Sequence, residues 1–206
     1  IAHCTDCGFM ATNPRPDENE IMEYYPEEYG PYQLNTARVE KMVAHQKKHP
    51  FLFSLVDPNI FKIGREKCAD CELKVLEIGC GAGNFLYELR LRFPKWKLVG
   101  TDFSVRSIEK LQEKGIEAYV SDLKELPHID KSQDIVYGFM IVEHLHRLEQ
   151  TLSEVRRILK DDGRFIVAVP NVKSIAFKVF GKYSNFLHIP AHLYHFDEGS
   201  LTSIMK

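Results

Sequence analysis

Apolar runs and helical patterns alternate between residues 75 and 169. Short apolar runs, most of them rich in β-branched residues, predict buried strands at residues 75–78, 97–102, 116–120, 134–140 and 164–169. Between these runs, apolar residues recur every three or four positions, which is typical of helices with one buried face. Strands that alternate with helices favour parallel pairing in a doubly wound sheet. The sequence therefore predicts an α/β fold with a mainly parallel sheet and helices on both of its faces.

The residues before this region have a different pattern. The prolines of residues 13–16 predict an extended stretch, after which Asp17 can cap a short helix. Residues 36–48 have an amphipathic helical pattern, and a further short helix can begin at Pro50.

These patterns predict two parts within one structural unit. Residues 1–72 are expected to form an N-terminal lid and helical segment that packs on the core. Residues 73–206 are expected to form the α/β domain that binds the ligand.

Composition and charge limit the possible partners. The chain has 206 residues, which is enough for one full core, and a formal net charge of -2. This charge gives no electrostatic reason to expect a nucleic acid or an anionic membrane as partner. No apolar run approaches the length of a membrane span, and five cysteines in a chain of this size favour a reducing compartment. We therefore expect a cytoplasmic protein without a membrane span.

Three glycines follow the first predicted strand directly. Gly79, Gly81 and Gly83 are spaced two apart, and helical spacing resumes after them. A strand, a glycine turn and a helix open a nucleotide-binding α/β unit, in which the ligand approaches bare backbone. Glu77 would repel a phosphate but suits a cationic ligand, and Asn84 stands where a dinucleotide site has its third glycine. A dinucleotide site and a tight turn without a ligand are the alternatives.

The sequence Glu77-x-Gly79-x-Gly81-x-Gly83 resembles motif I of the class I S-adenosylmethionine-dependent methyltransferases. The resemblance covers about residues 21–206, and its motifs recur in order with matching spacing. The N-terminal segment resembles a small-molecule subgroup that begins with a Cys-x-x-Cys-Gly element, here residues 4–8. The resemblance implies a Rossmann-like methyltransferase fold, S-adenosylmethionine as cofactor and S-adenosylhomocysteine as product. It also implies two more strands after residue 206, so we expect this sequence to lack the C-terminal strands.

The resemblance implies a cofactor site at the carboxyl ends of the strands. Asp102 ends the second strand and can accept both ribose hydroxyls, although it could also be only a helix cap. Asp122 would take the exocyclic amine of adenine, and the backbone amide of Leu123 would take a ring nitrogen. The predicted cofactor-binding residues are Glu77, Gly79, Gly81, Gly83, Asp102, Phe103, Asp122, Leu123 and Phe139.

Histidines are the candidate catalytic residues. A hydroxyl acceptor needs a base to remove its proton, and His144 follows the fourth predicted strand closely. The alternative is a histidine that only packs at the start of a helix. His192 and His195, in a histidine-rich segment near the C-terminus, are rival bases. We predict His144 and His192 as the catalytic residues, and we expect residues 24–32 and the segment around His192 to cover the cofactor from opposite sides.

No metal ion is predicted. Glu143-His144 resembles family members that bind a divalent metal through a Glu-x-x-Glu-His motif and a later histidine, but Met140 stands in place of the first Glu. The pairs Cys4/Cys7 and Cys68/Cys71 could in principle hold zinc together. We expect them not to close such a site.

The class of methyl acceptor is limited mainly by family motifs that this sequence lacks. Residues 138–141 read Gly-Phe-Met-Ile, where amino-methylating nucleic-acid enzymes of the family have Asn/Asp-Pro-Pro-Tyr. None of the cysteines follows a proline, as the nucleophile of cytosine C5 enzymes does. A small-molecule, sugar or lipid-linked acceptor is therefore expected, with O-methylation favoured over C- or N-methylation. The alternative from another class is a non-catalytic cofactor-binding module of the same fold with an assembly or regulatory role.

Overall fold

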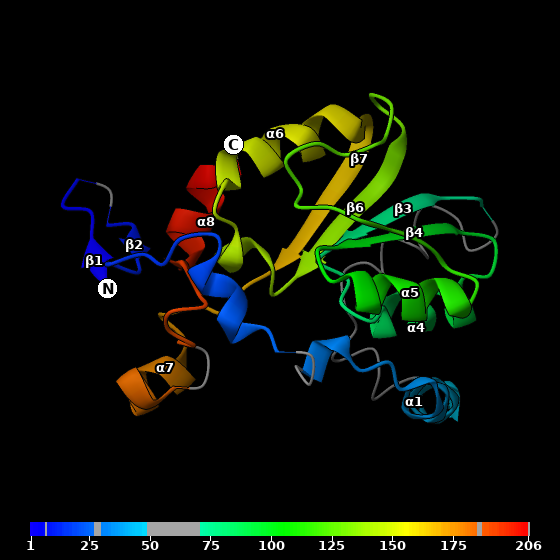
Figure 1. Cartoon of the computed structure of the whole chain (residues 1–206), viewed down its shortest axis with the longest axis horizontal. Helices are drawn as coiled ribbons and strands as arrows, with labels where there is room; N and C mark the ends of the chain where they lie inside the picture. Colours follow the sequence, from blue (N-terminus) through cyan, green and yellow to red (C-terminus); the bar gives the residue numbers. More distant parts are fainter. Residues whose placement is uncertain (7, 27–29, 49–70, 185–186, 206) are drawn as a thin grey trace. The chain divides into compact units, whose positions relative to one another are not determined.

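The computed structural model describes residues 1–6, 8–26, 30–48, 71–184 and 187–205 (Figure 1). The chain divides into two compact units. The α/β unit consists of residues 28–138 and 153–166, and the terminal unit of residues 1–27, 139–152 and 167–206. This division differs from the expected boundary at residue 72, because an N-terminal strand pairs with a strand close to the C-terminus.

A five-stranded sheet organises the α/β unit. Its strand order is β5-β4-β3-β6-β7. The strands are β3 (Lys74–Ile78), β4 (Lys97–Asp102), β5 (Glu117–Val120), β6 (Gln133–Phe139) and β7 (Leu159–Ala168). β3 pairs in parallel with both β4 and β6, and β4 pairs in parallel with β5. The mainly parallel sheet predicted from the alternating pattern is confirmed.

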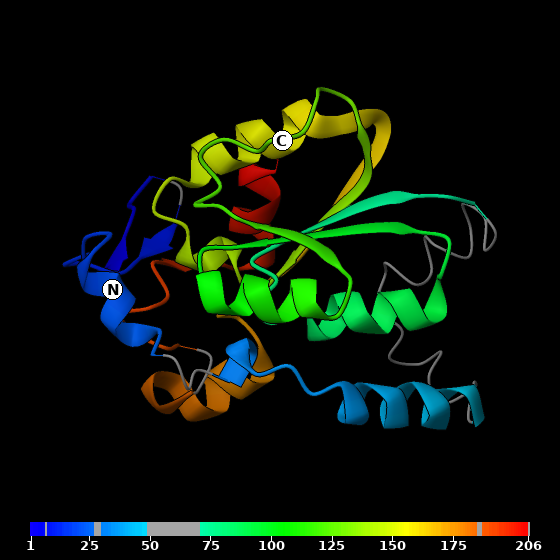
Figure 2. The same ribbon diagram turned by 45° about the vertical axis from the view of Figure 1, so that its right-hand side comes forward.

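Helices cover both faces of this sheet. Helices α4 (Asn84–Arg92) and α5 (Val105–Glu113) lie side by side on one face, and the C-terminal half of α6 (Leu148–Ile158) lies on the other (Figures 1 and 2). Helix α1 (Thr36–Lys48) has the predicted bounds and runs alongside α4 (Figure 2). The Tyr87 hydroxyl of α4 donates a hydrogen bond of 2.6 Å to the Glu40 carboxylate of α1.

The start of β7 was predicted wrongly. The sequence predicted a strand from Arg164, but β7 begins at Leu159 and includes residues 159–163. The ammonium group of Lys160 lies 2.7 Å from the Asp134 carboxylate of β6. This ion pair holds the early part of β7 against its neighbour in the sheet.

The terminal unit has a small sheet of its own. Strands β1 (Ala2–His3), β2 (Met10–Ala11) and β8 (Tyr194–His195) pair in the order β1-β2-β8, and both pairs are antiparallel. The unit also contains the short helices η1 (Glu20–Tyr24), η3 (Val142–His144), α7 (Ile175–Phe180), η4 (Gly181–Tyr183) and α8 (Glu198–Ile204). Asp197 caps α8, since its side chain accepts a hydrogen bond from the backbone amide of Ser200.

Some predictions fall on residues outside the described ranges. These are the short helix from Pro50 and the cysteines Cys7 and Cys68. No helix within the described ranges combines the length and the apolar character needed to cross a membrane.

Candidate active site

All three glycines of the turn after β3 have left-handed backbone conformations. Gly79, Gly81 and Gly83 all have positive φ, at 68°, 50° and 74°. A Cβ atom on Gly83 would lie 2.3 Å from the side chain of Leu111, which is fully buried in α5. Backbone conformation and close packing therefore both require glycine at this position.

Residues from η2 (Gly30–Tyr32) lie directly on this turn. The carbonyl oxygen of Pro31 accepts a hydrogen bond of 2.9 Å from the amide of Ala82. A Cβ atom on Gly81 would lie 2.5 Å from the same oxygen. The Tyr32 ring meets Phe103 edge-on, with ring centroids 6.1 Å apart. Residues 30–32, which belong to the segment expected to cover the cofactor, therefore pack on the glycine turn, where the sequence predicted close approach of a ligand.

Glu77 is buried at the end of β3. Its carboxylate accepts a hydrogen bond of 2.9 Å from the Tyr137 hydroxyl, which reaches it from the paired position on β6. Burial and, to a smaller extent, the nearby Asp102 carboxylate together raise the pKa of Glu77 to about 8. The negative charge expected at this position is therefore costly unless a cation compensates it.

Asp102 connects the glycine turn to the next helix. One carboxylate oxygen accepts from the amide of Gly81 at 2.8 Å, and the other accepts from the amide of Ser104 at 2.9 Å. The side chain of Ser104 is the one that caps α5, because it accepts from the amide of Ser107. Asp102 is 6% exposed, and burial raises its pKa. The backbone of Phe103 also hydrogen-bonds to this carboxylate.

The residues predicted to bind adenine already have partners. The exposed Asp122 pairs with the ammonium group of Lys124 at 2.7 Å, which lowers the pKa of Asp122. The amide of Leu123 donates to the Ser121 hydroxyl at 3.0 Å. Phe139 is the last residue of β6, and the two compact units divide just before it.

In the terminal unit, His144 lies at the end of η3. Its Nδ1 atom is 2.9 Å from the carbonyl oxygen of Ala191 and 2.6 Å from the Tyr25 hydroxyl oxygen. Because a carbonyl oxygen only accepts, the network assigns the proton to Nδ1 and leaves a lone pair on Nε2. Burial lowers the pKa of His144 to about 4, so the imidazole is neutral at neutral pH.

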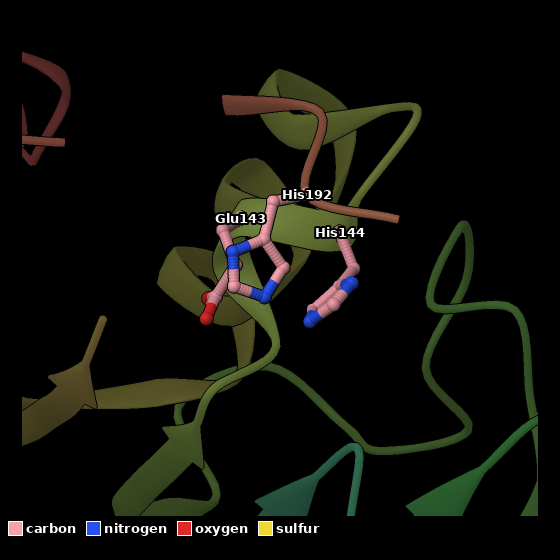
Figure 3. A group of neighbouring side chains, drawn as sticks. All are labelled: Glu143, His144 and His192. Atoms are coloured by element: carbon pink, nitrogen blue, oxygen red, sulfur yellow. The ribbon is translucent and has the colours of Figure 1, made fainter. Parts of the chain in front are cut away.

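His192 and Glu143 adjoin His144. The rings of His144 and His192 meet edge-on with centroids 4.6 Å apart. The backbone amide of Leu193 donates to the Glu143 carbonyl oxygen at 2.7 Å, which ties the segment before β8 to η3. Burial raises the pKa of the Glu143 carboxyl group to about 7. Figure 3 shows the three side chains pointing toward one another, with His192 between the other two in this view.

His195, the third candidate base, has a structural contact. Its Nε2 atom lies 3.0 Å from the Thr12 hydroxyl oxygen, and that hydroxyl donates to the His192 carbonyl oxygen at 2.6 Å. Nε2 therefore donates to Thr12, and His195 ties β8 to the residue after β2. Burial lowers the pKa of His195 to about 4.

Comparison with known proteins bears on the α/β unit. Residues 76–167 match a family model described as a methyltransferase domain. A protein of Mycolicibacterium smegmatis named "probable S-adenosylmethionine-dependent methyltransferase" is 31% identical over 102 residues, which are 47% of this chain and 38% of the relative. The malonyl-(acyl-carrier protein) O-methyltransferase of Hahella chejuensis is 29% identical over 115 residues, which are 54% of this chain and 40% of that protein. The chain thus spans less than half the length of these two curated relatives.

A solved structure is similar to this chain in fold. The crystal structure of an S-adenosylmethionine-dependent methyltransferase from Thermotoga maritima matches with a TM-score of 0.54 at 22% identity, covering 82% of this chain and 78% of that one. The α/β unit has the Rossmann-like methyltransferase fold. S-adenosylmethionine is accordingly the cofactor that the family match and the relatives imply.

Within this methyltransferase fold, the structure brings part of the predicted site together. Glu77, Gly81 and Asp102 are linked by packing, charge and a hydrogen bond at the ends of β3 and β4. Sequence analysis missed Tyr137 as the partner of Glu77. The two residues occupy paired positions on neighbouring strands, and this pairing becomes visible only once the strand order and register are known.

Proposed function

We propose that this chain is an S-adenosylmethionine-dependent methyltransferase that acts on the hydroxyl group of a small molecule, a sugar or a lipid-linked compound. The observation that carries the proposal is the group formed by Glu77, the glycine turn and Asp102. This group lies within the residues that match the methyltransferase domain.

The chemistry of these residues supports a cationic, phosphate-free cofactor. A buried carboxylate at Glu77 is stabilised by an ammonium or sulfonium group and would repel a pyrophosphate. The buried Asp102 carboxylate, at the end of β4, is the acceptor proposed for the ribose hydroxyls. Pro31 and Tyr32, on the glycine turn, would form part of the cover that keeps water from the methyl donor.

The proposed reaction requires little covalent chemistry from the protein. The acceptor oxygen forms a bond to the methyl carbon as the carbon–sulfur bond breaks, and the sulfonium becomes a neutral thioether. The proton of the acceptor hydroxyl must leave during this transfer. His144 and His192 are proposed for this step, and the Nε2 lone pair that the hydrogen bonds of His144 imply supports the choice.

O-methylation has support from one relative. The Hahella chejuensis protein is named as an O-methyltransferase, and its match to this chain reaches 29% identity. We extend the acceptor atom, but not that protein's substrate, to this chain.

Release of S-adenosylhomocysteine tests the proposal. The purified chain would be incubated with S-adenosylmethionine and, in separate reactions, with a sugar, a phenol and a lipid-linked acceptor. We expect release above the acceptor-free background with at least one hydroxyl compound, and loss of this release in the Asp102→Ala variant. Cofactor binding without transfer to any acceptor would instead favour a non-catalytic module of the same fold.

A further inference from the structure

Three side chains of the terminal unit form a group with the composition of a metal site. Glu143 and His144 come from η3, and His192 comes from the segment that precedes β8. Each offers one ligand atom, and these atoms all lie within 4.8 Å of one another. Figure 3 shows the carboxylate and the two imidazoles facing one another. Residues 48 positions apart in the sequence are thus brought together at one point.

The buried carboxylate of Glu143 requires a compensating interaction. Glu143 is 0% exposed, and neither of its carboxylate oxygens has a hydrogen-bond partner among the described residues. A carboxylate removed from water without a hydrogen bond or an opposite charge is strongly destabilising. A cation held next to the carboxylate would remove this cost.

His144 is oriented as metal-binding histidines usually are. Such a histidine donates the N–H of its other ring nitrogen to a carbonyl or carboxylate oxygen, which fixes the tautomer and the ring orientation. In His144 the Nδ1 atom has this role, because it donates to the Ala191 carbonyl oxygen at 2.9 Å. Its Nε2 atom is then available as a ligand.

We propose that Glu143, His144 and His192 bind one divalent transition-metal cation, with zinc as the first choice. Two neutral imidazoles and one carboxylate are a known ligand set for zinc sites that keep an open position. Ligand atoms around a four-coordinate zinc lie about 3.4 Å apart, so the three side chains must draw together by up to about 1.4 Å on binding.

The presence of Met140, where the resembling metal-binding motif has a glutamate, does not exclude a metal site. Three protein ligands are sufficient for a site with an open position, so none is needed from residue 140. The open position suits an oxygen ligand such as a hydroxyl group.

The consequence for catalysis rests on the proposed methyltransferase function. A hydroxyl bound to the cation loses its proton more readily, and the proton would pass to solvent. His144 would then act as a ligand rather than as the base. Methyl transfer would depend on the metal, whereas cofactor binding in the α/β unit would not.

Cobalt(II) titration tests the site directly. The chain, first treated with a chelator, would carry serine in place of Cys4, Cys7, Cys68 and Cys71, so that neither cysteine pair can bind the added metal. We expect one equivalent of Co²⁺ to bind, with a visible absorption band of nitrogen and oxygen ligands. Glu143→Gln and His192→Ala should each weaken binding at least tenfold, and His146→Ala, a half-buried histidine outside the group, should leave it unchanged.

A second measurement guards against variants that fail to fold. Added Zn²⁺ should raise the melting temperature of the chain with all three ligands and should not raise that of a folded Glu143→Gln variant. Absence of Co²⁺ and Zn²⁺ binding in the chain with all three ligands would overturn the proposal, and so would binding that survives loss of Glu143 and His192. Titration with S-adenosylhomocysteine in the same samples separates this failure from failure of the proposed function.

Discussion

Two regions of the molecule are assembled in opposite ways. They are the glycine turn of the α/β unit and the group of Glu143, His144 and His192 in the terminal unit. The first is nearly continuous in sequence, since Glu77, the three glycines and Asp102 lie within 26 residues. Its conformation follows from local requirements, namely positive φ and close packing. The second joins η3 to a segment near the C-terminus through backbone hydrogen bonds, such as that between Leu193 and Glu143. A local motif can be recognised from residue types, whereas a group assembled by tertiary contacts requires the structure.

The largest effect is expected from a substitution that disrupts the glycine turn. Gly83→Ala would place a Cβ atom 2.3 Å from the side chain of the buried Leu111 while φ is +74°. Left-handed strain and overpacking together should reduce the free energy of unfolding by about 2–5 kcal/mol. Gly115→Ala is the control, because its φ is +69° but only the end of the Arg90 side chain lies within 4 Å, at 3.9 Å, and it should lose only about 1–2 kcal/mol. Equal losses in chemical denaturation would show that packing at Gly83 does not matter.

A second test uses the charge of Glu77. Its pKa is about 8 in the folded chain against an ordinary value of 4.5. Between these values the folded state holds a proton that the unfolded chain has lost, so the free energy of unfolding should fall as the pH rises from about 5 to 8. The change should be on the order of a few kcal/mol. Glu77→Gln should reduce this slope and leave the part that the raised pKa of Glu143 contributes, and an unchanged slope would place the titrating group elsewhere.

Cofactor affinity distinguishes Asp102 from Asp122, two of the acidic residues predicted to bind the cofactor. Asp102→Ala removes a charge-assisted contact worth about 1.5–3 kcal/mol, so the dissociation constant for S-adenosylhomocysteine should rise about ten- to a hundredfold. Asp122→Ala should have a smaller effect, because Asp122 is exposed and paired with Lys124. Circular dichroism should verify that both variants are folded. A larger loss at Asp122 would reverse the two roles.

The smallest effect is expected at Tyr25. Tyr25→Phe removes the hydroxyl that lies 2.6 Å from Nδ1 of His144. A neutral hydrogen bond contributes about 0.5–1.5 kcal/mol, so turnover should fall about two- to tenfold while cofactor affinity stays the same. A change in cofactor affinity without a change in turnover would assign Tyr25 to the other site.

Much of the sheet could be predicted because its strands are short apolar runs separated by clear helical patterns. The glycine turn and the Asp102 carboxylate at the end of β4 were predictable from their spacing in the sequence. The start of β7 was not, because the polar sequence Lys-Asp-Asp-Gly indicates a turn until Lys160 is paired with Asp134. The contact of Pro31 with the glycine turn and the grouping of His192 with Glu143 also needed the structure, since nothing in the local sequence identifies partners so far apart.

The central claim is that the glycine turn binds a phosphate-free, cationic nucleoside. Calorimetry of the purified chain with S-adenosylmethionine, S-adenosylhomocysteine and NAD tests it most directly. Both adenosyl compounds should bind with one-to-one stoichiometry, and NAD should not bind. Binding of NAD without binding of either adenosyl compound would contradict it.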